Sequence, residues 1–167
     1  MKKLINKTII LSLFVALTGC NDWLDVSPKA DMKAEDLFGT EAGFRDALVG
    51  VYALMCGTNS YGRDLTYGYL DVLAQYYNSP LKTTSSGYEH NFKNAAEYKY
   101  TEKTEESRIS SIWSNHFSAV ANINQAMLFI DENKGVFTSP EVHDVYKGEF
   151  LALRAFLHFD ILRLFAP

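Results

Sequence analysis

Basic side chains are scarce over most of the sequence, and no apolar run is long enough to span a membrane. Three of the sixteen Lys and Arg residues and none of the twenty Asp and Glu residues lie in residues 1–19, so residues 20–167 carry 13 basic and 20 acidic side chains, a net charge of −7. This balance argues against a nucleic-acid partner, because binding to phosphates requires a basic surface.

The sequence also lacks the common motifs of catalysis and metal binding. There is no HExxH pattern, no glycine-rich phosphate loop and no nucleophile elbow. None of the four histidines shares a helix face with a second metal-type ligand, so we interpret all of them as structural or surface residues (His90, His116, His143 and His158). We therefore expect no enzyme activity, no metal and no cofactor.

The first twenty residues have the pattern of an export signal. Lys2, Lys3 and Lys7 precede an apolar core at residues 9–17, which the small residues Thr18 and Gly19 follow. The segment LTGC at 17–20 resembles the bacterial lipobox, in which the cysteine is acylated before cleavage. We predict a signal peptide at residues 1–19 and a lipidated Cys20. The alternative is an ordinary cleaved signal with an incidental cysteine.

With Cys20 acylated, Cys56 is the only remaining thiol, so the lipidated chain has no internal disulfide. We expect Cys56 to be a small buried residue at a helix end. Residues 20–36 mix acids, lysines and one proline without a sustained period, which predicts an extended tether to the lipid anchor. Residues 37–167 then form a helical region.

Apolar side chains recur at helical spacing in four segments, and no segment shows the alternation of a β-strand. The predicted helices cover residues 40–56, 64–79, 107–133 and a segment opening at TSPE, residues 138–141. Asp64 is the predicted cap of the second helix, and Thr138 and Glu141 the predicted capping box of the fourth. The fold class is therefore all-α, with antiparallel helix pairs.

The fourth helix is apolar on nearly its whole circumference. One stripe consists of Val142, Val145, Tyr146, Phe150, Leu153, Leu157, Ile161 and Leu164, and a second face of Phe156, Phe159, Leu162 and Phe165. A helix of this kind is expected to be buried on several sides. We therefore expect a partner for the second face beyond the given sequence, and we expect residues 20–167 alone to be poorly soluble or partly molten.

Four stretches of the sequence are distinctive: CNDWLDVSP (20–28), YGYLDVLAQYYN (67–78), IWSNHFSAVANINQAMLFID (112–131) and FLALRAFLHFDILRLFAP (150–167). Together they resemble the amino-terminal part of the SusD/RagB family of outer-membrane lipoproteins of Bacteroidetes. The last is the most specific, because the family's helix carries an arginine, paired aromatics, an aspartate and a second arginine before a turn. The matching residues here are Arg154, Phe156, Phe159, Asp160 and Arg163, and Ala166 departs from the family's commoner glycine.

The resemblance implies an incomplete SusD-like domain with tetratricopeptide-like helix pairs. It also implies a protein anchored by lipid in the cell outer membrane and exposed at the surface, which takes part in polysaccharide utilisation. Such proteins capture a glycan or glycopeptide without cleaving it and deliver it to a SusC-like TonB-dependent transporter. The alternative is a helical scaffold that binds the transporter and makes no sugar contacts of its own.

Eight of the ten tyrosines lie between residues 57 and 105. Aromatic rings beside amides and carboxylates match the flat faces and hydroxyl edges of sugars. The candidate ligand-binding residues are Tyr76, Tyr77, Tyr88, Asn91, Phe92, Tyr98 and Tyr100. The competing interpretation places Tyr69 and Tyr76 in the core and assigns the loop aromatics to packing. For the charges Arg154, Asp160 and Arg163 we expect a structural role, with Arg154 or Asp160 in a salt bridge or bonded to backbone.

Overall fold

The computed structural model describes residues 33–77 and 92–166, which belong to one compact unit. Its elements are the helices α2 (Ala34–Leu37), α3 (Glu41–Met55), α4 (Tyr69–Leu73), α5 (Lys93–Ala96), α6 (Lys103–Phe129), the 3-10 helix η2 (Lys134–Val136) and α7 (Pro140–Phe165). The described residues contain no strand. The predicted all-α fold class is confirmed.

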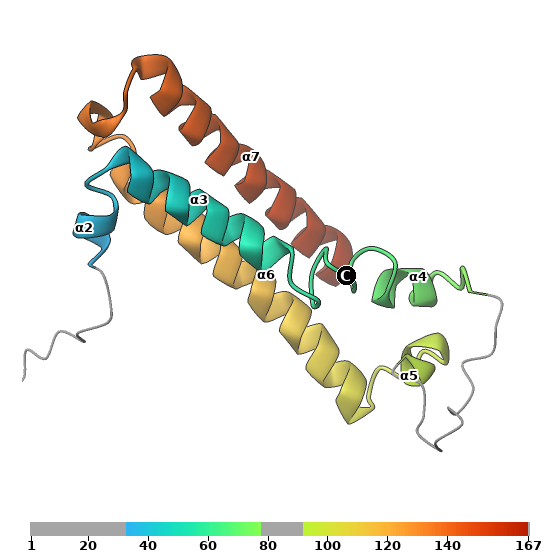
Figure 1. The fold of residues 1–167 in the computed structure, drawn as a ribbon. Coiled ribbons are helices and arrows are strands. Elements are labelled where there is room, and N and C mark those ends of the chain that lie inside the picture. The colour runs from blue at the N-terminus through green and yellow to red at the C-terminus, as the bar shows by residue number, and fades with distance from the viewer. Residues whose placement is uncertain (1–32, 78–91, 167) are drawn as a thin grey trace, which may run out of the picture. The chain divides into compact units, whose positions relative to one another are not determined.

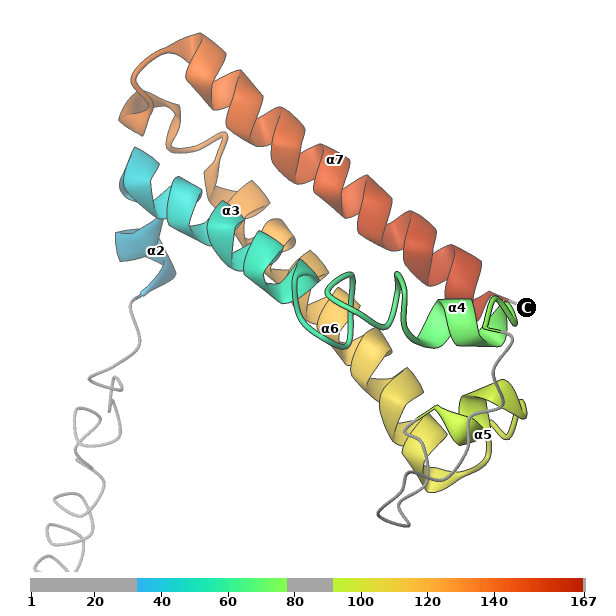
Figure 2. The ribbon, with the colours of Figure 1, turned by 45° about the vertical axis from the view of Figure 1, so that its right-hand side comes forward.

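Three long helices build the framework. Helix α6 runs antiparallel to both α3 and α7 and packs against each of them, whereas α3 and α7 contact one another less (Figure 1). The short helix α4 lies beside the carboxyl-terminal end of α7, and α5 lies beside the amino-terminal end of α6 (Figure 2). Segments that are far apart in the sequence therefore meet around α4.

The main core lies between the three long helices. Phe44, Ile123, Ile130, Phe150 and Leu157 are fully buried in it. Burial of each such side chain contributes about 1.5–3 kcal/mol, so this core is the principal source of stability. A second, smaller core joins α4, α5 and α6 through Leu65, Tyr69, Val72, Ala95 and Ile112.

Helix α3 agrees with the sequence prediction. The side chain of Thr40 accepts a hydrogen bond from the backbone N–H of Gly43 at 3.1 Å, and Cys56 is the carboxyl-terminal cap. Gly43 is required for space, because a Cβ added there would lie 1.6 Å from the carbonyl oxygen of Leu37 in α2. The prediction that Cys56 is buried is wrong, since its side chain is exposed.

The predicted helix at 64–79 is wrong over most of its length, since α4 spans only Tyr69–Leu73. The preceding residues form successive turns, in which Gly62 donates to the carbonyl of Gly57. A Cβ at Gly62 would lie 2.2 Å from the carbonyl oxygen of Cys56, so these turns bring the backbone too close to itself for any side chain at this position. Asp64 caps no helix, because its carboxylate pairs with arginines instead.

The other helix boundaries differ from the predictions in detail. Helix α6 begins four residues earlier than predicted, and the first three of the four residues of α2 fall in the predicted extended tether. The predicted capping box of the fourth helix is wrong: Ser139 caps α7 by accepting from the N–H of Val142. Thr138 instead donates both its N–H and its hydroxyl to Glu41 Oε2, each at 2.7 Å. This contact joins the beginning of α7 to the beginning of α3.

Helix α7 has one buried and one exposed apolar face. Phe150, Leu153, Leu157 and Ile161 are buried as predicted, but Val145 is 65 % exposed and does not belong to the core stripe. Of the second face, Phe156, Phe159 and Leu162 are 46 %, 59 % and 61 % exposed. Phe165 is half-buried, with its ring 4.9 Å from that of Trp113 on α6. Within the described residues, most of this second face is uncovered.

Candidate functional site

Exposed tyrosines gather around α4 and α5. Tyr76 and Tyr77 follow α4, and Tyr98 and Tyr100 follow α5. These side chains are between 45 % and 76 % exposed, so their rings are accessible to a ligand. Tyr88 and Asn91, which were also predicted to bind ligand, lie outside the described residues. The competing prediction that Tyr76 belongs to the core is wrong, whereas Tyr69 is buried as that interpretation expected.

Hydrogen bonds hold two of these tyrosines in place. The Tyr98 hydroxyl donates to the carbonyl of Leu73 at 2.9 Å, and the Tyr77 hydroxyl donates to the carbonyl of Tyr67. Tyr98 has a φ of 54°, a left-handed conformation that is uncommon for a residue other than glycine. The rings of Tyr98 and Tyr100 lie 6.2 Å apart at 52°. These two rings therefore form a tilted aromatic pair with a fixed position beside α4.

Gln75 links the two short helices α4 and α5. Its side-chain amide donates to the carbonyls of Val72 and Ala96, each at 3.2 Å. Gln75 itself has a φ of 59°, as is common for the residue after a helix end. The same residue thus ends α4 and fixes its distance to α5.

Phe92 differs from the other predicted ligand-binding residues. It is half-buried, and the guanidinium groups of Arg108 and Arg63 lie 4.5 Å and 5.4 Å from its ring centre. Such cation–π contacts contribute about 0.5–1 kcal/mol at exposed sites and more when desolvated. In this structure Phe92 covers the arginines, so it is a packing residue of the small core.

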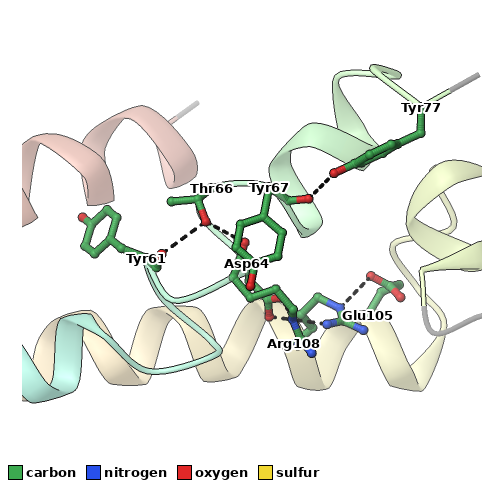
Figure 3. A network of polar contacts seen from close by, with 8 residues as sticks. Tyr61, Asp64, Thr66, Tyr67, Tyr77, Glu105 and Arg108 are labelled. Carbon is green, nitrogen blue, oxygen red and sulfur yellow. Dashed lines mark hydrogen bonds and ion pairs between the residues drawn. The ribbon is translucent and has the colours of Figure 1, made fainter.

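A buried charge cluster joins the turns before α4 to α6. Asp64 Oδ1 is 2.7 Å from Arg63 Nε, and Asp64 Oδ2 is 3.4 Å from Nη1 of Arg108 on α6. Arg108 Nε is in turn 3.6 Å from Glu105 Oε2 (Figure 3). Sequence reasoning missed this cluster, because Asp64 resembled a helix cap. The signal that could have found it is the Glu105–Arg108 spacing of three residues, which places both side chains on one face of a helix.

Burial changes the proton affinity of this cluster. The Glu105 side chain is fully buried, and desolvation raises the pKa of its carboxyl, although the nearby Arg108 opposes the shift. Burial likewise raises the pKa of the neighbouring Tyr69 to about 12, and the charge of Glu105 adds to that effect. The ion pairs of this cluster therefore attach the turns that precede α4 to helix α6. Burial of the charged groups costs desolvation free energy, which offsets part of the gain.

A second polar network surrounds Asp160. The Tyr61 hydroxyl donates to Asp160 Oδ2 at 2.5 Å and lies 3.3 Å from His116 Nε2, and Arg163 is 2.8 Å from Asp160 Oδ1. Burial, followed by the hydrogen bond to Asp160, raises the pKa of Tyr61 well above its ordinary value. The expectation of a salt bridge is confirmed for Asp160. Arg154 makes a hydrogen bond to Asn124 at 3.2 Å.

The described histidines have no common site. His116 and His143 are buried, His158 is exposed, and His90 lies outside the described residues. His116 Nδ1 lies 2.9 Å from the carbonyl of Ile112, one turn earlier on α6. In residues 33–77 and 92–166, no group of three His, Cys, Asp or Glu side chains is arranged to hold a metal ion.

Comparison of the chain with protein-family models, with curated proteins and with solved structures found no match. Among the helices that the structure describes, none has the length and apolar character needed to cross a membrane.

Proposed function

We propose that the chain is the amino-terminal part of a SusD/RagB-type lipoprotein that captures a glycan or glycopeptide at the cell surface for import by a TonB-dependent transporter. The observation that carries the proposal is the group of exposed tyrosines around α4 and α5, with Tyr98 and Tyr100 as a fixed aromatic pair. Aromatic rings whose faces are open and whose position is fixed are suited to the apolar faces of sugar rings. The lipobox-like LTGC and the resemblance of the four stretches support the same proposal.

Under this proposal, each ring contributes a modest part of the affinity. An aromatic contact adds about 0.5–1.5 kcal/mol beyond the area it buries, so a pair of rings gives weak binding to one sugar unit. Many anchored copies meeting a multivalent glycan would bind more tightly than one copy. The tetratricopeptide-like arrangement of helix pairs belongs to the proposal as well.

Glycan binding is tested with purified protein on an array of polysaccharides and by calorimetry. We expect the double variant Tyr98→Ala, Tyr100→Ala to lose binding to any glycan that the wild type binds. Tyr52→Ala is the matched control, because Tyr52 is also exposed but lies on α3. Equal binding by the double variant and the wild type would contradict the assignment of the site.

The lipid anchor has a separate test. Mass spectrometry of the mature protein is expected to show an amino-terminal Cys20 that carries two or three acyl chains. Cys20→Ala should release the protein from the outer-membrane fraction, since two chains are needed for stable attachment. An unmodified Cys20 in soluble periplasmic protein would contradict the lipoprotein assignment.

The second candidate function is a scaffold that binds the transporter without contacting sugar. The exposed face of α7 favours it, because Phe156, Phe159 and Leu162 are large apolar side chains of a kind that contacts other proteins. Co-purification of the transporter by a protein that binds no polysaccharide would support the scaffold. Loss of co-purification in the tyrosine double variant would instead place the transporter contact at Tyr98 and Tyr100.

A further inference from the structure

An apolar cavity of about 310 Å³ opens between α4, α6 and the end of α7. Six of its nine lining residues are leucine or isoleucine, and the others are Tyr69, Tyr100 and Phe165. Figure 2 shows the carboxyl-terminal end of α7 beside α4, where Leu164 and Phe165 contribute to the wall. The volume lies near the lower limit of ligand pockets in proteins, which is about 300–1,000 Å³.

The lining excludes two classes of ligand. No lining residue is charged, so an ion placed inside would lose its hydration without gaining a partner. The aliphatic walls also offer few hydrogen bonds to a sugar, whose hydroxyl groups would be desolvated. The cavity is therefore not an extension of a glycan site, and it is suited to an uncharged apolar body.

Only one of the two lining tyrosines can form a hydrogen bond with a ligand's polar group near solvent. The Tyr69 hydroxyl is buried and has no hydrogen-bond partner among the described residues, whereas Tyr100 is 45 % exposed. Tyr100 is therefore the lining side chain that is both polar and reachable from solvent. A ligand with its apolar part inside would place a polar group beside Tyr100.

We propose that this cavity binds a small uncharged amphipathic molecule, with an aromatic or aliphatic body inside and one hydroxyl or carbonyl group at Tyr100. The cavity shares Tyr100 with the proposed glycan site, but its other lining residues are apolar or buried, so binding of an apolar probe inside it does not require glycan binding. The cavity is formed by residues of α4, α6 and α7 together with Leu65 and Tyr100 from the adjoining segments, and most of these residues already belong to the small core, so binding requires no new fold.

The test uses 4-phenyl-1-butanol and its hydrocarbon analogue butylbenzene as probes. Trp113 reports binding by fluorescence, because its ring is 4.9 Å from that of the lining residue Phe165. Trp23→Phe leaves Trp113 as the only tryptophan of the chain. We expect saturable binding of the alcohol with a Kd on the order of 0.1 mM, as is typical for a ligand of this size.

Three variants separate the contributions. Tyr100→Phe should weaken binding of the alcohol about two- to tenfold, the effect of one hydrogen bond, without changing binding of butylbenzene. Leu73→Phe should fill the cavity and weaken binding of both probes more than tenfold. Tyr67→Phe is the control, since Tyr67 is exposed but does not line the cavity, and it should bind as the wild type does.

The absence of saturable binding by either probe would overturn the site. Equal affinity of Tyr100→Phe and the wild type for the alcohol would overturn the assignment of the polar end. Unchanged binding by Leu73→Phe, with circular dichroism like that of the wild type, would place the probes elsewhere and also overturn the proposal.

Discussion

The hydroxyl of Tyr61 lies 2.5 Å from Oδ2 of Asp160, although 99 residues separate them in the chain. Tyr61 belongs to the turns after α3, and Asp160 is buried on α7. The same hydroxyl lies 3.3 Å from His116 on α6. One tyrosine thus connects a loop to two of the three long helices, and its hydrogen bond stabilises a carboxylate that is shielded from water.

Tyr61→Phe removes this hydrogen bond and leaves Asp160 with Arg163. Because hydrogen bonds to charged groups contribute about 1.5–3 kcal/mol, we expect the free energy of unfolding to fall by that amount. Urea denaturation measures the change. Tyr76→Phe, a substitution at a highly exposed tyrosine, should alter it by less than about 0.5 kcal/mol. Equal stability of Tyr61→Phe and the wild type would show that the bond contributes nothing net.

The two glycines of α3 allow a matched comparison. A Cβ at Gly43 would lie 1.6 Å from the Leu37 carbonyl oxygen, whereas one at Gly50 would meet no atom within 4 Å. Gly43→Ala must displace α2, so we expect a loss of about 1–3 kcal/mol. Gly50→Ala should stabilise the protein by about 0.5–1 kcal/mol, because alanine favours the helix. Thermal and urea unfolding of both variants would check the opposite signs, and a tolerated Gly43→Ala would contradict the close approach.

The sequence pattern predicted the long helices well and the region between α3 and α6 poorly. Helices α3, α6 and α7 have sustained apolar periodicity, and long-range packing reinforces that local preference. The turns before α4 depend on contacts that no local pattern contains. Asp64 is attached to Arg108, 44 residues later, and this pairing outweighs its tendency to cap a helix.

For the candidate site, the sequence predicted only which interval is rich in tyrosine and not how its side chains are arranged. The abundance of tyrosines indicated the interval, but the position of the Tyr98 side chain depends on its left-handed backbone and on its hydrogen bond to the carbonyl of Leu73. Phe92 could not be distinguished from these residues by sequence, because its role comes from the arginines that lie over its ring. The cavity likewise forms only because the end of α7 packs near α4, and the spacing of apolar residues along the sequence does not predict that contact.

Glu105 and Glu41 should make opposite contributions to the pH dependence of the free energy of unfolding. Burial raises the pKa of Glu105, so the folded state binds a proton there more tightly than the unfolded state does. Stability from this site is therefore present at low pH and is lost as pH rises through the raised pKa. Relative to the wild type, Glu105→Gln should therefore gain stability as pH rises above about 4.3, the ordinary pKa of a glutamate carboxyl, because the variant cannot ionise.

Glu41 provides the opposite case. Its hydrogen bonds from the hydroxyl and backbone N–H of Thr138 lower the pKa of its carboxyl. Stability from Glu41 is present above its unfolded pKa and is lost as pH falls through the folded value. Relative to the wild type, Glu41→Gln should therefore be less stable at neutral pH, and the difference should shrink on acidification. Urea denaturation of the wild type, Glu105→Gln and Glu41→Gln from acidic to neutral pH measures how each stability difference changes with pH. If both differences changed in the same direction, the opposite pKa shifts of Glu105 and Glu41 would be contradicted.

Two apolar residues near the end of α7 test whether its outer face contributes to stability. Leu157 is fully buried in the main core, whereas Phe159 is 59 % exposed. Leu157→Ala should lower the free energy of unfolding by about 2–5 kcal/mol, the usual cost of such a cavity. Phe159→Ala removes a larger side chain from the same helix, but little of its surface is buried, so its cost should stay below about 1 kcal/mol. Denaturation in urea gives both values, and a cost at Phe159 that matches the cost at Leu157 would show that another part of the protein covers this face.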